Sequence, residues 1–168
     1  MEKETYDMLK EIVPETTDEQ QFTKHWQMKV KKLHPNAEIP VKSHPSDLGW
    51  DLFNIEELDI PPLNRKLIRT GIAIQFPENV GGILKDRSGV ASKLGLFVKA
   101  GVIDPNYRGE IMVLMYNSTN KPVNIGVGAR IAQMILIPTF SVYNSILYEV
   151  DELDETDRGT AGLGSTGS

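Results

Sequence analysis

Five short polar segments, each containing glycine, hold the side chains best suited to chemistry in this chain. They are residues 48–52, 86–91, 101–109, 128–133 and 158–167. Glycine lets backbone N–H groups approach an anion, hydroxyl groups donate hydrogen bonds to its oxygens, and arginine supplies a forked cation. The last segment combines four glycines, hydroxyl side chains and Arg158, and this composition is typical of a phosphate-binding loop.

Each segment alone also has a simpler interpretation. Arg87-Ser88-Gly89 is compatible with an ordinary turn, and Asp104-Pro105-Asn106-Tyr107 has residue types that favour a hairpin turn. Residues 158–167 carry too little apolar surface to hold themselves in place, which also fits an unstructured terminus. The individual segments therefore leave a binding role and a structural role both open.

The elements that must position these segments have the pattern of short strands. From Met28 onward, apolar runs are interrupted by glycine, proline or asparagine about every ten residues. Ile72, Ile74 and Phe76 alternate with smaller or polar residues, whereas residues 111–116 and 131–137 are apolar on both faces. This pattern predicts an antiparallel sandwich or barrel. Strands that are apolar on both faces also indicate an interface between subunits.

The two ends of the chain differ from this central region. Residues 1–27 contain no glycine, and the spacing of Tyr6, Leu9 and Val13 predicts a helical extension. Residues 151–155 form an acidic run, which favours a solvated linker before the glycine-rich end. The expected organisation is an extension (1–27), a β domain (28–150), and a linker with a flexible tail (151–168).

The composition excludes several functional classes. No cysteine is present, which excludes disulfides, cysteine-based metal sites and thiol catalysis. The net charge of −5 makes general nucleic-acid binding unfavourable, because such binding depends on neutralising phosphates. No apolar run is long enough to span a membrane, and the first residues lack the features of a secretion signal. These features fit a cytoplasmic protein.

The five segments together, by their order, spacing and content, resemble the five motifs of the trimeric dUTP pyrophosphatases (dUTPases). The resemblance covers about residues 28–168, and its most specific parts are residues 101–109 and 162–167. It implies an all-β fold, an antiparallel β jelly-roll assembled as a homotrimer with composite active sites. The implied activity is Mg²⁺-dependent hydrolysis of dUTP to dUMP and pyrophosphate. That reaction keeps uracil out of DNA and supplies dUMP for dTMP synthesis.

The resemblance also implies roles for individual residues around the phosphates. Asp104 matches the general base that activates the water attacking the α-phosphorus, and Asp51 matches a supporting residue near the metal-bound water and the arginines. The positions implied to contact phosphate are Arg87, Ser88, Gly89 and Gln133, with Arg158, Ser165 and Thr166 of the closing tail. No direct protein ligand to Mg²⁺ is expected, because substrate phosphates and water can hold the ion.

Other matched positions would recognise the nucleoside. Tyr107 matches the residue that packs beneath the deoxyribose and leaves no room for a 2′-hydroxyl. The matched hairpin, whose backbone reads uracil, consists of Lys99, Ala100, Gly101, Val102 and Ile103. Leu163 stands where the family has a phenylalanine over the uracil ring, so we expect weaker closure of the tail. In the family, the third motif comes from one subunit, the first, second and fourth from another, and the tail from a third.

The sequence departs from the family pattern at three further positions. Leu48 replaces an alanine, Asp86 replaces a proline and Ala129 replaces an aspartate.

Two alternative functions remain beside this prediction. The related dCTP deaminases share the Ile-Asp-Pro sequence, but they carry a proton-shuttling glutamate where this chain has Leu114. A regulatory or binding module is the other alternative, with residues 1–27 docking a protein partner.

Overall fold

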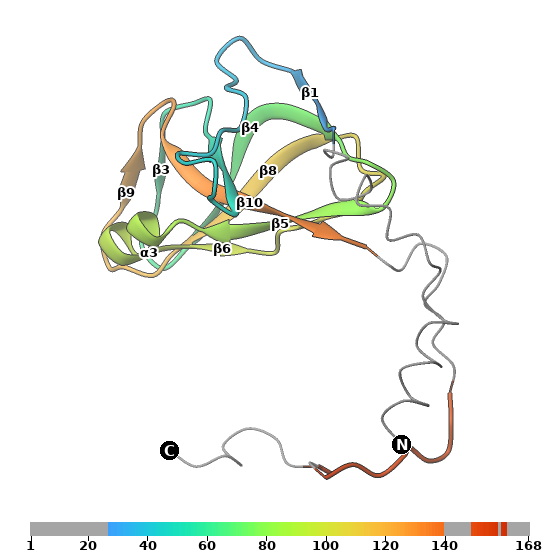
Figure 1. Cartoon of the computed structure of the whole chain (residues 1–168). Coiled ribbons are helices and arrows are strands. Elements are labelled where there is room, and N and C mark those ends of the chain that lie inside the picture. Colours follow the sequence, from blue (N-terminus) through green and yellow to red (C-terminus); the bar gives the residue numbers. More distant parts are fainter. Residues whose placement is uncertain (1–26, 140–148, 158, 161–168) are drawn as a thin grey trace.

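Antiparallel strands make up most of the folded protein. The computed structural model describes residues 27–139, 149–157 and 159–160. In chain order, the strands are β1 (Lys29–Lys32), β2 (Gly49–Phe53), β3 (Leu58–Ile60), β4 (Arg65–Gln75), β5 (Val80–Asp86), β6 (Leu96–Lys99), β7 (Val102–Ile103), β8 (Glu110–Asn117), β9 (Val123–Ile125) and β10 (Arg130–Pro138). Figure 1 shows these strands wrapped into two layers. The predicted all-β jelly-roll is confirmed.

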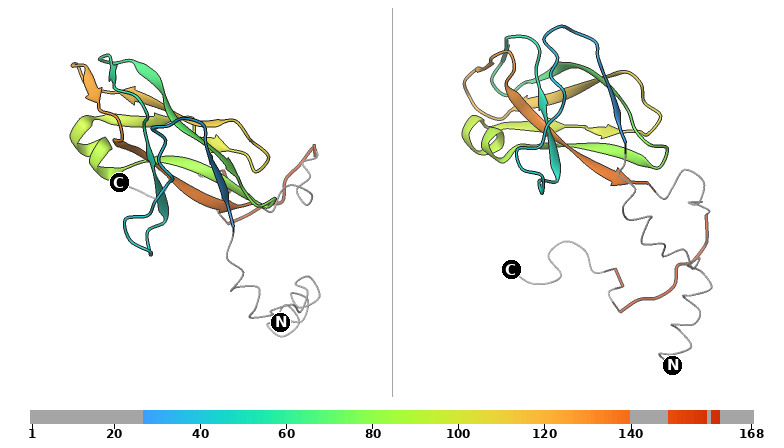
Figure 2. Two further views of the ribbon diagram at one scale, coloured as in Figure 1. Left: turned by 90° about the horizontal axis from the view of Figure 1, so that it is seen from above. Right: turned by 45° about the horizontal axis from the view of Figure 1, so that its top comes forward.

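The strands pair into three sheets. One four-stranded sheet has the order β1-β4-β8-β6, and the other has the order β2-β10-β5-β7. Strands β3 and β9 form a separate two-stranded sheet. Neighbours in a sheet are far apart in sequence, as in the pairing of β2 with β10, so distant segments are brought together. Figure 2 shows the two larger sheets from other sides.

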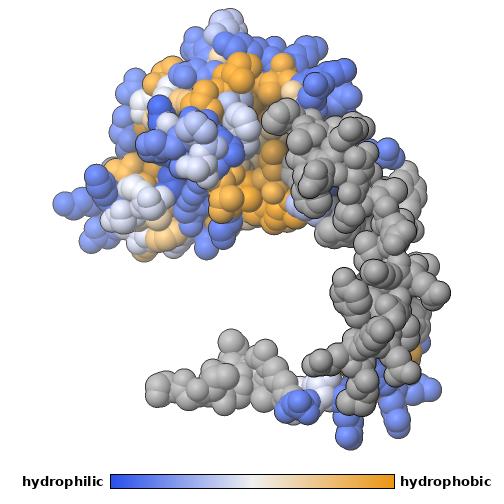
Figure 3. Space-filling view, viewed as in Figure 1, coloured by the Kyte–Doolittle hydropathy of each residue, from blue (hydrophilic) through white to orange (hydrophobic). Residues whose placement is uncertain are grey.

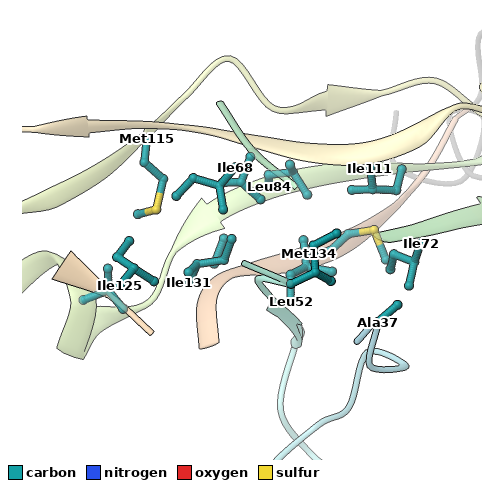
Figure 4. Packing of buried hydrophobic residues seen from close by; sticks show 14 of the residues in the cluster. Ala37, Leu52, Ile68, Ile72, Leu84, Ile111, Met115, Ile125, Ile131 and Met134 are labelled. Atoms are coloured by element: carbon teal, nitrogen blue, oxygen red, sulfur yellow. The ribbon is translucent and has the colours of Figure 1, made fainter. Parts of the chain in front are cut away.

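The hydrophobic core fills the space between the two larger sheets. In β8, Ile111, Val113 and Met115 are fully buried, whereas the alternating residues are only half-buried. Met134 of β10 packs into the same core from the opposite sheet, as Figure 4 shows. The outer face of β8 is half-buried, and it is the face that the two-sided apolar pattern predicts to lie in a subunit interface.

A glycine bulge bends the long strand β4. The pairing of β4 with β8 shifts between Arg69 and Ala73, and Gly71 has a φ of +66°. Glu110 stabilises the bulge, because its carboxylate accepts the N–H of Gly71 at 2.8 Å and pairs with Arg69 at 3.1 Å. No local pattern predicts this contact, since its partners lie about 40 residues apart.

A single helix is present in the described part of the chain, and the sequence did not predict it. Helix α3 (Ser88–Leu94) begins directly after β5, and its side chains provide no N-terminal cap. It ends at Gly95, whose φ of +62° is the left-handed conformation that glycine adopts without strain. Because the helix starts at Ser88, the backbone of residues 87–89 is fixed at the end of β5.

The predicted helical extension (1–27) lies outside the described residues except for its last residue, Gln27. Among the described residues, no helix is long and apolar enough to cross a membrane.

Candidate functional site

The first concave site, here called the arginine cleft, has a volume of about 650 Å³. It lies where β2, the end of β5, the start of α3 and β10 meet. Its lining residues are Ser43, Ser46, Asp47, Leu48, Gly49, Asp51, Arg87, Ser88, Gly89 and Gln133. All five residues that the sequence assigned to phosphate contact or its support, outside the tail, are therefore gathered in one cleft.

Asp51 orients the arginines of this cleft. Its side chain is 9% exposed, and it pairs with Arg87 at 2.7 Å and with Arg130 at 3.2 Å. One carboxylate thus holds two guanidinium groups in fixed positions, and Arg130 is held further by Ser43 at 3.0 Å. The cluster of one carboxylate and two arginines has a net positive charge, which suits an anionic ligand.

Gln133 enters the arginine cleft because its neighbour lacks a side chain. A Cβ atom on Gly49 would lie 2.1 Å from the Gln133 amide oxygen and 2.9 Å from its Cβ. The amide nitrogen of Gln133 donates to the backbone carbonyl of Asp86 at 2.8 Å. The glycine in the first motif is therefore needed for the position of the glutamine in the fourth.

The second concave site, here called the Asp104 cleft, has a volume of about 420 Å³. It is lined by Leu67, Leu84, Lys99, Ala100, Gly101, Val102, Ile103, Asp104, Tyr107, Glu110, Met112 and Leu114. Every residue that the sequence assigned to nucleoside binding outside the tail is present, together with the predicted base. The two clefts share no lining residue.

The turn between β6 and β7 forms one wall of the Asp104 cleft. Ala100 and Gly101 both have positive φ values, +61° and +124°. The carbonyl of Gly101 accepts the N–H of Leu84 at 2.8 Å, and a Cβ on Gly101 would lie 3.0 Å from that leucine. The turn is therefore pressed against β5, with its backbone facing the cleft in a conformation that costs energy for the non-glycine residue Ala100.

Asp104 follows β7 and begins a tight turn, in which the N–H of Tyr107 donates to the Asp104 carbonyl at 3.1 Å. The carboxylate is exposed, and none of the described residues pairs with it. It differs in this respect from Asp51, whose two oxygens are both occupied. A free carboxylate can accept a proton from a bound water.

The position of the Tyr107 ring depends on Gly109. The Tyr107 hydroxyl donates to the backbone carbonyl of Glu110 at 3.1 Å. A Cβ on Gly109 would lie 2.3 Å from the hydroxyl oxygen, so the ring lies directly over the glycine. This contact holds the aromatic ring at the rim of the cleft, where it is 39% exposed.

The remaining predicted residues, Arg158, Leu163, Ser165 and Thr166, lie outside the described residues. Conversely, the sequence analysis gave no role to Ser43, Asp47 or Glu110, each of which lines a cleft. Arg130 was also missed, although it stands in the fourth motif beside Ile131. Its only sequence signal was its charge next to a strand of apolar residues.

Leu114 lines the Asp104 cleft, at the position that bears on the deaminase alternative. Its side chain cannot transfer a proton. The other carboxylate in the lining, Glu110, is already paired with Arg69 and with the N–H of Gly71. Asp104 is therefore the one unpaired carboxylate among the described residues that line this cleft.

Comparisons with known proteins give a consistent result. The dUTPase family model matches residues 35–167. A deoxyuridine 5′-triphosphate nucleotidohydrolase of Clostridium novyi is 43% identical over 140 residues, covering 82% of this chain and 96% of the relative. One from Clostridium kluyveri is 45% identical over 141 residues, covering 83% and 96%.

Solved structures show the same similarity. A variant dUTPase of Staphylococcus bacteriophage 80alpha with dUpNHpp has a TM-score of 0.76 and 29% identity, covering 84% of this chain and 99% of that chain. A variant dUTPase of phage phi11, described for the coordination of a structural Mg(II) ion, has a TM-score of 0.69 and 26% identity, covering 77% and 99%.

Proposed function

This chain belongs to the dUTPase family, and from that premise we propose that it hydrolyses dUTP to dUMP and pyrophosphate. The observation that carries the proposal is the division of the predicted site into two clefts. One is lined by Arg87, which Asp51 holds in place, and the other holds the carboxylate of Asp104, which pairs with none of the described residues, beside a backbone turn. These are the parts that a nucleoside triphosphate hydrolase needs, a cationic site for phosphates and a base beside a nucleoside pocket.

The arginine cleft binds the triphosphate. Arg87 is held by Asp51 and remains 30% exposed, so its guanidinium is oriented but still accessible to an anion. Ser88, Gly89 and Gln133 add hydrogen-bond donors around it. Donors that are held in place before the reaction stabilise the charge that develops on the phosphates without further rearrangement.

The Asp104 cleft binds the deoxynucleoside and activates water. The backbone of the turn at residues 99–103 offers donors and acceptors to the edge of uracil, and its close approach excludes a 5-methyl group. The ring of Tyr107 packs against the deoxyribose and excludes a 2′-hydroxyl. The carboxylate of Asp104 accepts a proton from the water whose oxygen attacks the α-phosphorus. The bond from that phosphorus to the bridging oxygen breaks, and pyrophosphate leaves with the electron pair.

Magnesium fits this site as a partner of the substrate. No group of three or more histidine, cysteine, aspartate or glutamate side chains gathers among the described residues in a way that could hold a metal ion. Asp51 is engaged by two arginines, so it supports the cleft through them. Mg²⁺ held by the triphosphate and water would neutralise charge on the phosphates.

A homotrimer explains why one chain carries two clefts that share no residue. In a trimer, the Asp104 cleft of one subunit can face the arginine cleft of the next, which makes a complete site from two halves. The apolar surface among the polar residues in Figure 3 leaves area for such packing, and Leu67 on the outer face of its sheet is 49% exposed. Residues 158–168 would close each site from a further subunit.

The biological role that follows is removal of dUTP and supply of dUMP for dTMP synthesis, in the cytoplasm. The direct test is pyrophosphate release from dUTP, dTTP, dCTP and UTP, each with Mg²⁺. We expect turnover of dUTP far above that of the other three. Equal turnover of UTP would contradict the role of Tyr107, and ammonia release from dCTP would support the deaminase alternative.

A further inference from the structure

Asp86 connects the two clefts within one chain. It is the last residue of β5, directly before Arg87, and it is half-buried. Its backbone carbonyl accepts a hydrogen bond from the side-chain amide of Gln133, which lines the arginine cleft. Its carboxylate accepts the N–H of Val98 in β6, one residue before the turn that lines the Asp104 cleft.

The contact between Asp86 and Val98 completes a series along β5. Gly82 pairs with Ile103, Ile83 pairs with Val102, and the N–H of Leu84 donates to the carbonyl of Gly101. The backbone pairing stops there, because β6 leaves to pair with β8 in the other sheet. The side chain of Asp86 bridges the gap, so the turn is anchored to β5 at both of its ends.

The connection between β5 and Val98 depends on the side chain of Asp86, because no backbone pairing joins the strands at this point. Figure 1 shows β5 and β6 running side by side although they belong to different sheets. A carboxylate is a charged acceptor, and hydrogen bonds to charged groups are stronger than those between neutral groups. Without it, the N–H of Val98 would lose the acceptor that it has in this half-buried place, which carries an energetic cost.

We propose that Asp86 is a positioning residue for base discrimination, which acts by holding the turn of residues 99–101 against β5. This inference rests on the proposed function. Exclusion of a 5-methyl group requires a wall that cannot move back, and two of the three turn residues have positive φ values. The φ of +61° at the non-glycine residue Ala100 carries an energetic cost, so the turn keeps this shape best while both of its ends are held.

The effect of Asp86 falls on binding more than on the chemical step. Asp104 is positioned by its own tight turn with Tyr107 and by the pairing of β7 with β5, neither of which involves the Asp86 side chain. Loss of the carboxylate therefore loosens the base-reading turn while the catalytic carboxylate stays in place.

The experiment compares Asp86→Ala and Asp86→Asn with a matched control, in the full-length chain. Asn keeps an acceptor oxygen and removes the charge. The control is Asp59→Ala. It removes a carboxylate that accepts a hydrogen bond from the Asn124 amide at 3.0 Å. Asp59 lies on the β3–β9 sheet and lines neither cleft. The measurements are kcat and KM for dUTP and dTTP with Mg²⁺.

For Asp86→Ala, we expect KM for dUTP to rise about tenfold, with kcat within about threefold of wild type, as for loss of one strong hydrogen bond. The preference for dUTP over dTTP falls by about tenfold. Asp86→Asn keeps both values within about threefold, and Asp59→Ala leaves them unchanged. An Asp86→Ala variant with wild-type KM and preference overturns the proposal, and so does an Asp86→Asn variant as impaired as Asp86→Ala.

A measurement on the wild-type protein keeps the proposal testable if Asp86→Ala does not fold. The Val98 amide should exchange its hydrogen slowly, as other hydrogen-bonded strand amides do. Exchange as fast as at the exposed residues Gly126 and Val127 would overturn the anchor. Failure of the proposed function has a different result, since wild-type protein would then release no pyrophosphate from dUTP.

Discussion

The arginine cleft and the Asp104 cleft are built on opposite plans. In the arginine cleft, charged side chains neutralise and orient one another, with Asp51 occupied by Arg87 and Arg130. In the Asp104 cleft, most of the lining is backbone and apolar side chains. Its Glu110 is paired with Arg69, and Asp104 is the acidic group that has no partner among the described residues. The comparison indicates that paired charges bind and orient, whereas an unpaired charge is available to react.

The largest effect should come from Asp104→Asn, which removes the proposed base and preserves the shape of the side chain. We expect kcat to fall by about a thousandfold, within the range that general base catalysis contributes. Binding of dUpNHpp, measured by calorimetry, should stay within a few fold of wild type, because the arginine cleft is intact. Near-normal turnover would show that Asp104 is not the base.

The sequence predicted two kinds of feature correctly: individual strands, and the grouping of certain residues that lie far apart in the chain. The apolar runs of residues 111–116 and 131–137 were sufficient to predict β8 and β10, because a short apolar run bounded by turn residues is a local signal. The grouping of Arg87 with Gln133, and of Tyr107 with Lys99, followed from the family resemblance and matches the two clefts. Local pattern was therefore enough for the strands, and motif order was enough to group these residues by cleft.

The missed features depend on contacts that no local pattern encodes. Helix α3 was missed because Ser88-Gly89-Val90 has weak helix propensity and no side-chain cap, so its formation depends on packing of Val90. Met112, to which the sequence analysis assigned no part in the site, lines the Asp104 cleft on the outer face of β8. The pairing of Glu110 with the Gly71 bulge depends on the register of β4 and β8.

Mixing two inactive variants should restore activity if the clefts of different subunits face each other. One variant carries Asp104→Asn, and the other carries Arg87→Ala. Each mixed trimer then contains sites that combine an intact Asp104 cleft with an intact arginine cleft, and about a quarter of all sites should be complete at equal, random mixing.

The measurement is pyrophosphate release after co-expression, with mass spectrometry to verify mixed trimers. Homotrimers of each variant, purified separately and then combined without exchange, are the control. Background activity in verified mixed trimers would mean that both clefts serve the same subunit's site.

Arg87→Lys should test whether the arginine cleft contributes to the choice of base or sugar. Lysine keeps the charge and loses the guanidinium group, whose Nε atom pairs with Asp51 at 2.7 Å, so such a change is not conservative. We expect kcat/KM for dUTP to fall about thirtyfold, with an equal fall for dTTP and UTP, because in the proposed binding mode the arginine cleft contacts only phosphates. A changed preference among the bases or sugars would break the assignment of binding roles to the two clefts. Lys66→Arg, on the exposed part of β4, is a control for a change of cation outside both clefts.

Gly109→Ala should produce the converse result, a moderate loss that depends on the sugar. The added Cβ would lie 2.3 Å from the Tyr107 hydroxyl oxygen and 2.6 Å from the ring carbon that carries it, so the ring must move. Because Tyr107 is the residue proposed to exclude a 2′-hydroxyl, the preference for dUTP over UTP should fall about tenfold, within the range that one methylene contributes to discrimination.

The matched control for Gly109→Ala is Gly126→Ala, since a Cβ on Gly126 meets no atom within 4 Å. That variant should keep wild-type kinetics and stability. The ratio of kcat/KM for dUTP to that for UTP is the quantity to measure, because a general loss of stability would lower both values together. If Gly109→Ala leaves the ratio unchanged while Tyr107 is displaced, sugar discrimination belongs to another part of the Asp104 cleft. Recognition of the sugar would then have to be assigned to residues 99–103, which line the same cleft, in place of Tyr107.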